Sequence, residues 1–466
     1  MYRNEIDAYF AQHRDDLLRD IGRLIAIKSV REDPKPDMPY GEGPYKALRE
    51  ACAIAEELGF TVRSFDNHVL TAEMGPQPAE LGILAHLDVV PEGAGWTYEP
   101  YRMIEDGGKI YGRGVSDDKG PAVVALYAAV AAKAIAPQFK KGVRIILGTA
   151  EETGSEDLEH YFKQETPPPF SFSPDAGYPV INIEKGSHSP IFSQSWPEDK
   201  ALPRVSYIHG GVTKNIVTRE AYALTEGLSK AEVDALCAKH AQKTGVRFTV
   251  SETDTGLRID ALGVSAHAAH PSDGKNAQTA LLALLAELPL ADSACARAIR
   301  SLHELFPYGD DGGNAIGVAQ KDDISGELTL VFSVLELTPT GFSGRYDSRV
   351  PICATWETMG SITVNALKAK GFDVTSTRMK PPHHTPADLP FVKTLLKVYE
   401  DYTGNKGECI AIGGGTYVHD IEGGVAFGCE LPGTDNHIHG ADEFAIIDEL
   451  LLSGRMFTQI ILDMCC

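Results

Sequence analysis

The sequence predicts an α/β fold in which one sheet domain is interrupted by a large inserted domain. Three observations support this prediction: the chain has 466 residues, apolar strand-like runs alternate with runs of helical spacing, and acidic residues follow several predicted strands. A chain of this length exceeds one ordinary core, so two or more domains are expected. Polar residues at strand ends are typical of α/β sheets, which bind ligands at the carboxyl ends of their strands.

The individual elements follow from apolar periodicity along the chain. Helical spacing predicts helices over 5–29, 45–58, 121–134 and 391–403, and from about Ile446 onward. Apolar runs predict strands over 61–73, 81–87 and 143–147, and another just after Asp175. From about Ser187 the strand ends lose their acidic residues. We therefore expect one discontinuous domain of residues 1–186 and 379–466, and an inserted domain of residues 187–378.

The composition argues against several classes of partner. Asp and Glu outnumber Lys and Arg, 65 against 43, and the resulting net charge of −22 disfavours nucleic acid and anionic membranes. The eight cysteines form no CxxC pair, which favours a reducing compartment. The polar N-terminus does not resemble a signal peptide, and the longest apolar run, 122–132, is too short to span a bilayer. We therefore expect a cytoplasmic protein without a nucleic-acid or membrane partner.

The stretch 83–96 carries the first candidate site residues. His86 and Asp88 follow an apolar run and stand two apart, so an extended backbone turns both side chains to one side. A carboxylate beside a histidine fixes its tautomer and raises its basicity, as the surroundings of a metal site require. A hydrogen-bonded pair at a strand end, without a metal, is the simpler interpretation of these two residues.

More candidate ligands follow at later strand ends and at one helix start. Together with His86, the candidates are Asp117, Glu151, Glu152, Asp175, and either His437 or His439. Histidines mixed with carboxylates suit zinc or manganese better than calcium, and there are too many candidates for one ion. The pattern therefore predicts a site for two ions. Such a site supports hydrolysis, in which a water shared by the ions gives its proton to a free carboxylate.

Six motifs follow one another along the chain: HLDVVP, GRGVSDDKGP, GTAEETGS, SPDAGYP, GVSAHAAHP and HGADE. In their order and spacing, and over nearly the whole chain, they resemble the zinc aminoacylase/ArgE/DapE/carnosinase family of metallopeptidases. The DDKGP form, the GGVTKNIV motif and the long insertion are most similar to bacterial PepV-type dipeptidases. The resemblance implies a zinc-peptidase-like three-layer catalytic domain with a mixed sheet, interrupted by an inserted α+β lid domain. It also implies two zinc ions per subunit, for which manganese or cobalt can substitute.

The resemblance further implies roles for residues of the sheet domain. The positions that correspond to metal ligands are His86, Asp117, Glu152, Asp175 and His439. Asp117 corresponds to the carboxylate that bridges the two ions, and Asp88 to the residue that orients the first histidine. Glu151 corresponds to the general base. His439 fits the family's closing HxxxE pattern better than His437 does.

Residues that contact the substrate are also implied by the resemblance. His267 corresponds to the lid histidine that stabilises the oxyanion, and Asn215 to a second lid contact. Arg349 corresponds to the residue that binds the substrate carboxylate, for which a bidentate guanidinium is better than lysine. Gly413, Gly414 and Gly415 would offer backbone amides to the same carboxylate.

The leading prediction is a dizinc dipeptidase that acts on dipeptides or short peptides with a free carboxylate. It would use a metal-bound water, with Glu151 as general base. An N-acyl amino acid amidohydrolase of the same family is the alternative, because its substrates carry the same carboxylate. A catalytically dead, metal-holding binding protein is the alternative from another class, and the presence of Glu151 with every proposed ligand argues against it. The long insertion favours a monomer in which His267 serves its own chain.

Overall fold

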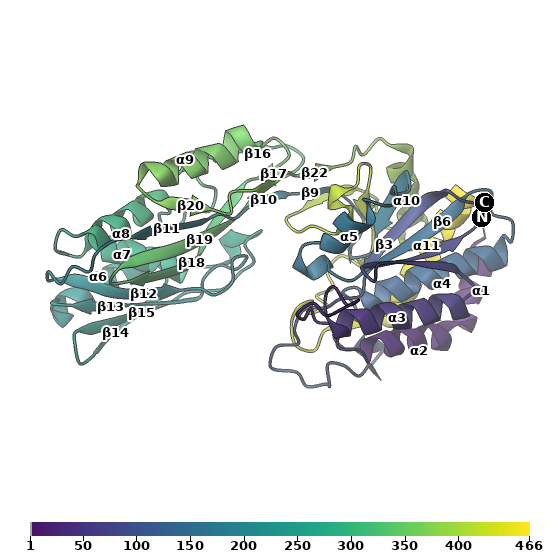
Figure 1. Cartoon of the computed structure of the whole chain (residues 1–466), viewed down its shortest axis with the longest axis horizontal. Helices are drawn as coiled ribbons and strands as arrows, with labels where there is room; N and C mark the ends of the chain where they lie inside the picture. The colour runs from purple at the N-terminus through teal and green to yellow at the C-terminus, as the bar shows by residue number, and fades with distance from the viewer. Residues whose placement is uncertain (1) are drawn as a thin grey trace. The chain divides into compact units, whose positions relative to one another are not determined.

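The protein, described by a computed structural model over residues 2–466, divides into two compact units (Figure 1). The first unit comprises the chain up to Glu184 together with His384–Cys466, and the inserted unit is Lys185–His383. These divisions differ slightly from the expected ones because 186–188 pair with 379–380, which keeps both segments in the inserted unit.

A mixed sheet forms the centre of the first unit. Its strands are β1 (Thr61–Phe65), β2 (Val69–Met74), β3 (Ala79–His86), β6 (Gly142–Gly148), β7 (Phe170–Ser173), β9 (Val180–Glu184), β22 (His383–His384), β23 (Cys409–Ile412) and β24 (Val425–Ala426). Their order is β1-β2-β6-β3-β7-β24-β9-β22, and β23 also pairs with β9. Strand β3 runs parallel to both β6 and β7, so the carboxyl ends of these three strands meet at one edge.

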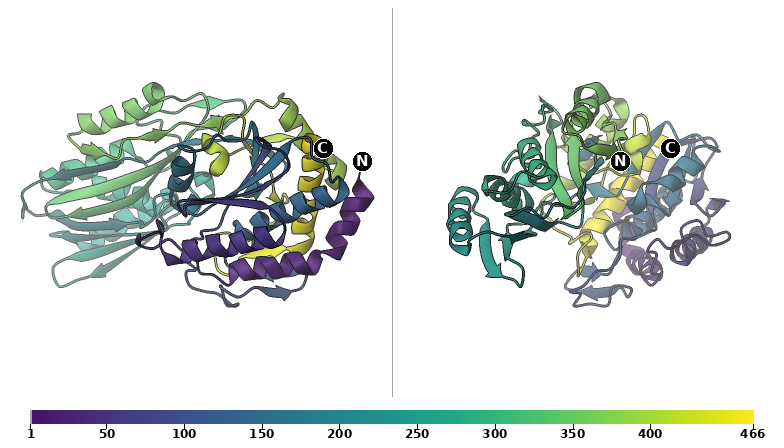
Figure 2. Two further views of the ribbon diagram at one scale, coloured as in Figure 1. Left: turned by 45° about the vertical axis from the view of Figure 1, so that its right-hand side comes forward. Right: turned by 60° about the vertical axis from the view of Figure 1, so that its left-hand side comes forward.

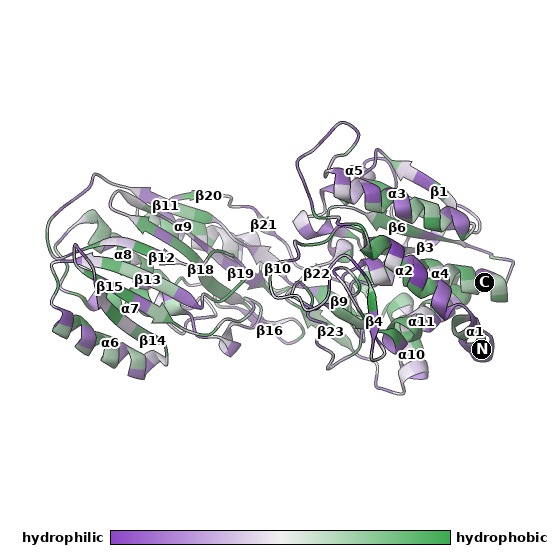
Figure 3. Cartoon of the chain, turned by 90° about the horizontal axis from the view of Figure 1, so that it is seen from below, coloured by the Kyte–Doolittle hydropathy of each residue, from purple (hydrophilic) through white to green (hydrophobic). Residues whose placement is uncertain are grey.

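Helices cover both faces of this sheet. They are α1 (Arg3–Gln12), α2 (Arg14–Ile25), α3 (Glu42–Glu57), α4 (Lys119–Ile135), α5 (Glu156–Tyr161), α10 (Pro390–Thr403) and α11 (Ile447–Cys465). Within β3, Ile83 and Ala85 pack into the core under α1–α4, α10 and α11, whereas Leu84 faces Leu158 and Tyr161 of α5. This alternation gives a three-layer arrangement. Helices α2 and α3 lie side by side (Figure 2). Strands β3 and β6 and helix α4 are largely apolar (Figure 3). No helix among residues 2–466 is both long and apolar enough to cross a membrane.

Shorter elements of the first unit carry loops toward the carboxyl edge. They are β4 (Ile104–Asp106), β5 (Lys109–Tyr111), β8 (Ala176–Gly177), β25 (Cys429–Glu430), β26 (Phe444–Ile446) and the 3-10 helices η1 (Glu151–Thr153) and η4 (Tyr417–Asp420). Pairing of β26 with β5 and of β25 with β8 ties the C-terminal segment to the N-terminal one. The two separated parts of the chain thus build one unit.

The inserted unit is an antiparallel sheet with helices, as the expected α+β composition requires. Its main strands are β10 (Gly186–His188), β11 (Ile191–Ser195), β12 (Arg204–Gly210), β13 (Glu220–Glu226), β14 (Arg247–Glu252), β15 (Leu257–Leu262), β18 (Thr329–Thr338), β19 (Gly341–Val350), β20 (Asp373–Thr375) and β21 (Met379–Lys380). The order is β14-β15-β13-β12-β18-β19-β10-β21. The helices α6 (Lys230–Thr244), α7 (Ala277–Glu287), α8 (Ala294–Leu305) and α9 (Ser361–Ala369) share one apolar core with the sheet.

Two predicted elements are divided in the structure. The helix expected over 5–29 is two helices, α1 and α2, which meet at His13. The strand expected over 61–73 is the hairpin β1–β2. Its turn contains Asp66 and Asn67, whose φ angles of 49° and 58° reverse the chain direction.

Candidate functional site

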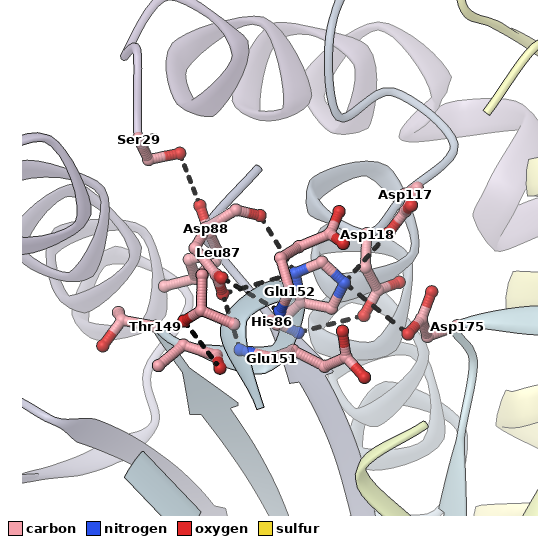
Figure 4. Close-up of polar contacts among 12 residues, drawn as sticks. Ser29, His86, Leu87, Asp88, Asp117, Asp118, Thr149, Glu151, Glu152 and Asp175 are labelled. Atoms are coloured by element: carbon pink, nitrogen blue, oxygen red, sulfur yellow. Dashed lines mark hydrogen bonds and ion pairs between the residues drawn. The ribbon is translucent and has the colours of Figure 1, made fainter. Parts of the chain in front are cut away.

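His86 is the last residue of β3 and is fully buried at the carboxyl edge (Figure 4). Its Nδ1 lies 2.9 Å from the carbonyl oxygen of Asp88, so this nitrogen carries the proton and Nε2 faces the site. Nε2 lies 2.9 Å from Asp117 Oδ1 and 3.5 Å from Asp175 Oδ2. Burial lowers the pKa of His86, but these carboxylates outweigh it and raise the pKa well above its usual value. A positive charge at Nε2, from a proton or a metal ion, is therefore favoured.

Asp117 connects His86 with a second histidine. Its other oxygen, Oδ2, lies 2.9 Å from Nε2 of His439, which is also 3.1 Å from Glu152 Oε1. Hydrogen bonds to these two carboxylates raise the pKa of His439 to about 10. The two oxygens of Asp117 each face a different histidine, as those of a ligand shared by two ions would. His437 is exposed and lies edge-on to the ring of Phe444.

The site concentrates more negative than positive charge. Five carboxyl groups gather around the two histidines: Asp117, Asp118, Glu151, Glu152 and Asp175. Burial, followed by the charge of Asp117, raises the pKa of Asp175 to about 7, and burial also raises the pKa of Glu151. Such crowding is costly unless a cation compensates it. The mixture of imidazole and carboxylate donors suits a divalent ion such as zinc or manganese.

Two groups of three residues have ligand atoms within 4.8 Å of one another: His86, Asp117 and Glu152, and His86, Asp118 and Asp175. Asp118 is a member that the sequence did not single out as a ligand. Its Oδ2 accepts a hydrogen bond from the backbone N–H of His86, and its buried Oδ1 has no hydrogen-bond partner among the described residues. Its position next to Asp117 in the DDKGP motif was the available signal. The donor set fits metal ions, with Asp118 as an additional candidate beside the predicted ligands.

Asp88 holds the turn that carries Glu151 and Glu152. Its Oδ1 and Oδ2 accept hydrogen bonds from the backbone N–H groups of Glu151 and Glu152, each at 3.2 Å. The carboxylate was expected to orient His86, whereas in the structure the closer contact to that ring comes from the Asp88 carbonyl oxygen. Asp88 therefore links the strand end of β3 to η1, the short helix that follows β6 (Figure 4).

Two buried acids that were not predicted as site residues shape the loops around the site. Glu443 accepts hydrogen bonds from Arg113 at 2.6 Å and from the backbone N–H groups of 114, 116 and 117, which fixes the loop before α4. Asp157 accepts from the backbone N–H groups of 149 and 150 and from the Tyr417 hydroxyl. Burial raises the pKa of Asp157 to about 6. Both acids stabilise backbone next to proposed ligands.

The residues expected to contact substrate fall into both units. Within the inserted unit, Asn215 and His267 lie on adjacent segments. The Ala268 N–H donates to the Asn215 carbonyl oxygen at 2.9 Å, and Ile216 pairs with His267. The His267 side chain is exposed. Arg349, on β19, is half-buried and donates from Nε to Asp347 at 2.7 Å. In the first unit, the three glycines 413–415 directly follow β23.

Comparisons with known proteins identify the family to which the chain belongs. Residues 82–463 match the model of the peptidase family M20/M25/M40. The chain is 34% identical over 457 residues to "Putative dipeptidase YtjP" of Bacillus subtilis (strain 168), covering 97% of each chain. It is 33% identical to the "Beta-Ala-Xaa dipeptidase" of Lactobacillus delbrueckii subsp. lactis, covering 97% of this chain and 96% of the relative. Human carnosine dipeptidase 1 has a similar fold, with a TM-score of 0.59 at 15% identity and 99% coverage of both chains. The chain therefore belongs to peptidase family M20/M25/M40 and is a peptidase.

Proposed function

We propose that the protein is a dizinc dipeptidase that hydrolyses the amide bond of dipeptides or short peptides with a free carboxylate. The observation that carries the proposal is the position of Asp117, one oxygen of which faces His86 while the other faces His439. The match to peptidase family M20/M25/M40 and the two relatives named as dipeptidases support it.

In this proposal, His86, Asp117 and Asp175 would hold one divalent ion, and Asp117, Glu152 and His439 would hold the other. Zinc suits these donors, and manganese or cobalt can substitute. When bound, two such ions would supply Lewis-acid chemistry, namely polarisation of the scissile carbonyl and a water acidic enough to attack it near neutral pH. The buried carboxyl groups that would otherwise repel one another support this assignment.

Glu151 is the proposed general base. Burial raises the pKa of its carboxyl group, which favours a group that accepts a proton from water and then gives it to the leaving amine. Asp88 fixes the backbone of Glu151 through the 3.2 Å hydrogen bond, so the carboxylate starts from a defined position. The histidines are proposed as ligands and take no proton in this scheme.

Substrate recognition is assigned to the proposed lid residues and the glycine loop. Arg349 and the amides of 413–415 bind the free carboxylate, His267 stabilises the developing oxyanion, and Asn215 is a second contact of the lid with the substrate. A preorganised oxyanion donor can contribute on the order of 3 kcal/mol to the transition state. The neighbouring backbone positions of Asn215 and His267 support their joint action. The proposed substrate partner is a small peptide, and the proposed working form is a monomer.

The test compares dipeptides with N-acetyl amino acids by product analysis, before and after removal of divalent ions with EDTA. We expect hydrolysis of dipeptides, loss of activity with EDTA, and recovery with zinc, manganese or cobalt. Glu151→Gln is the inactive control. Preferential cleavage of the N-acetyl amino acids would instead establish the deacylase alternative. Full activity in a metal-free preparation would overturn the proposed use of metal ions.

A further inference from the structure

Glu184 is a buried carboxylate at the point where the chain leaves the first unit. It is the last residue of β9 and has no exposed surface. Its Oε1 accepts hydrogen bonds from the Thr416 backbone N–H at 3.1 Å and from the Thr416 hydroxyl at 2.8 Å. Its Oε2 lies 3.0 Å from Nδ1 of His419. All three contacts come from the segment that follows the glycines 413–415.

The glycine loop is attached to β9 at both of its ends. Before the loop, β23 pairs in parallel with β9, and Ile412 lies opposite Glu184 (β9 and β23 are labelled in Figure 3). After the loop, Thr416 and His419 hold the Glu184 carboxylate. The loop also passes close to this carboxylate, since a Cβ added to Gly415 would lie 3.3 Å from Glu184 Oε2. Without such attachment, consecutive glycines sample many backbone conformations.

We propose that Glu184 is a positioning residue that holds 413–415 in the conformation in which their amides bind the free carboxylate of the substrate. This inference rests on the proposed function, which assigns the carboxylate to these amides. Burying a carboxylate is costly unless several donors satisfy it, and here the donors belong to the segment that directly follows the loop. The same contacts that satisfy Glu184 therefore fix the loop, and through it the preference for substrates with a free carboxylate.

The experiment measures KM and kcat for a dipeptide and for the same dipeptide with a C-terminal carboxamide. We expect the wild-type enzyme to bind the free acid better than the amide. Glu184→Ala should raise KM for the free acid roughly tenfold or more, because displaced amides lose contacts to a charged group. The KM for the amide and the kcat for both substrates should change little. Glu184→Gln should largely retain wild-type behaviour, because its amide oxygen can accept both Thr416 hydrogen bonds and its amide nitrogen can donate to Nδ1 of His419 once that imidazole takes its other neutral tautomer.

Two further variants provide an independent test of the same contact and a control. Thr416→Val removes the hydroxyl donor from the other side of the contact, so it should shift the acid-to-amide ratio in the same direction, and it decides the question if Glu184→Ala does not fold. Glu73→Ala is the matched control, because it removes a different buried carboxylate of the same sheet, one bonded to Arg144 at 2.7 Å. It should change stability without changing the ratio.

The outcomes separate this inference from the proposed function. If the wild-type enzyme hydrolyses the acid and the amide equally well, the proposed recognition of a free carboxylate fails, and the role of Glu184 fails with it. If the wild type discriminates and Glu184→Ala discriminates equally, only the positioning role is overturned. An equal rise of KM for both substrates would also overturn it, since a general structural defect has that signature.

Discussion

Glu151 and Glu152 are neighbours in sequence but differ in their surroundings. Both backbone N–H groups donate to Asp88, yet only the Glu152 side chain contacts a histidine, with Oε1 3.1 Å from His439 Nε2. Burial raises the pKa of both carboxyl groups. A residue in contact with a proposed ligand is suited to hold an ion, and its neighbour without such a contact is suited to move a proton.

This difference predicts opposite effects for two isosteric variants. Glu151→Gln should keep both metal ions and lose roughly three orders of magnitude in kcat, because the amide accepts no proton. Glu152→Gln should lower the metal content. Steady-state kinetics and metal analysis of the purified proteins measure the two effects. Glu159→Gln, which alters an exposed acid on α5, is the matched control. Loss of metal from Glu151→Gln together with its retention in Glu152→Gln would show that the roles are exchanged.

Among single residues, the sequence indicated candidates that stand at strand ends and missed the residues that support them. His86 and Asp175 could be found because apolar runs precede or follow them. Asp157 and Glu184 could not, because their partners, Tyr417 and Thr416, lie in a segment separated from them by the whole inserted unit. Nothing in a local pattern indicates which distant donor a buried acid will meet.

Strand β10 contains His188, a histidine whose pKa differs between the folded and the unfolded chain. His188 has no exposed surface, and its Nδ1 lies 2.7 Å from the Tyr346 hydroxyl of β19. Burial lowers its pKa from 6.5 to about 4. The unfolded chain therefore binds a proton at this site over a pH range in which the folded unit does not. The contribution of His188 to the free energy of unfolding is fully present above about pH 6.5 and is lost as the pH falls toward 4.

We expect the free energy of unfolding of the inserted unit to fall with acidification, by roughly 3 kcal/mol at most from this one residue. Urea unfolding of the wild type and of His188→Gln at pH 7 and pH 5 measures the difference. The variant should be less stable at neutral pH and should lose less stability on acidification. The control is His384→Gln, which changes an exposed histidine. Identical pH dependence of the wild type and His188→Gln would contradict the prediction.

Several elements were predicted closely from their apolar patterns. Helices α4, α10 and α11 and strand β6 lie close to their expected ranges. The hairpin β1–β2 was expected as one strand, because Asp66 and Asn67 adopt positive φ only in the context of the pairing that follows. Turn conformation depends on the register of both strands, which a single run of residues does not specify.

For the whole molecule, the proposed site residues are distributed over two units of one chain. Glu151 belongs to the first unit and His267 to the inserted unit. We propose that both act on the same substrate molecule within one chain. In a dimer the two residues could instead come from different subunits, and the two arrangements predict different results when inactive variants are mixed.

Mixing two inactive variants distinguishes these arrangements. Glu151→Gln and His267→Ala should each be nearly inactive, and their equimolar mixture should remain so if each chain uses its own histidine. The mixture is assayed after incubation long enough for subunits to exchange, with each variant alone as the control. Recovery of activity in the mixture would show that one subunit completes the site of another, and would contradict the proposed monomer.

The divided first unit also determines when the protein can become active during its synthesis. His86, Asp117, Glu152 and Asp175 emerge early from the ribosome, but His439 and the glycines 413–415 follow only after the entire inserted unit. Helix α11, which packs on α4, also follows the inserted unit in the sequence. A nascent chain therefore lacks a complete proposed site until the segment through His439 has been translated, so products truncated before His439 would be inert toward the peptides around them.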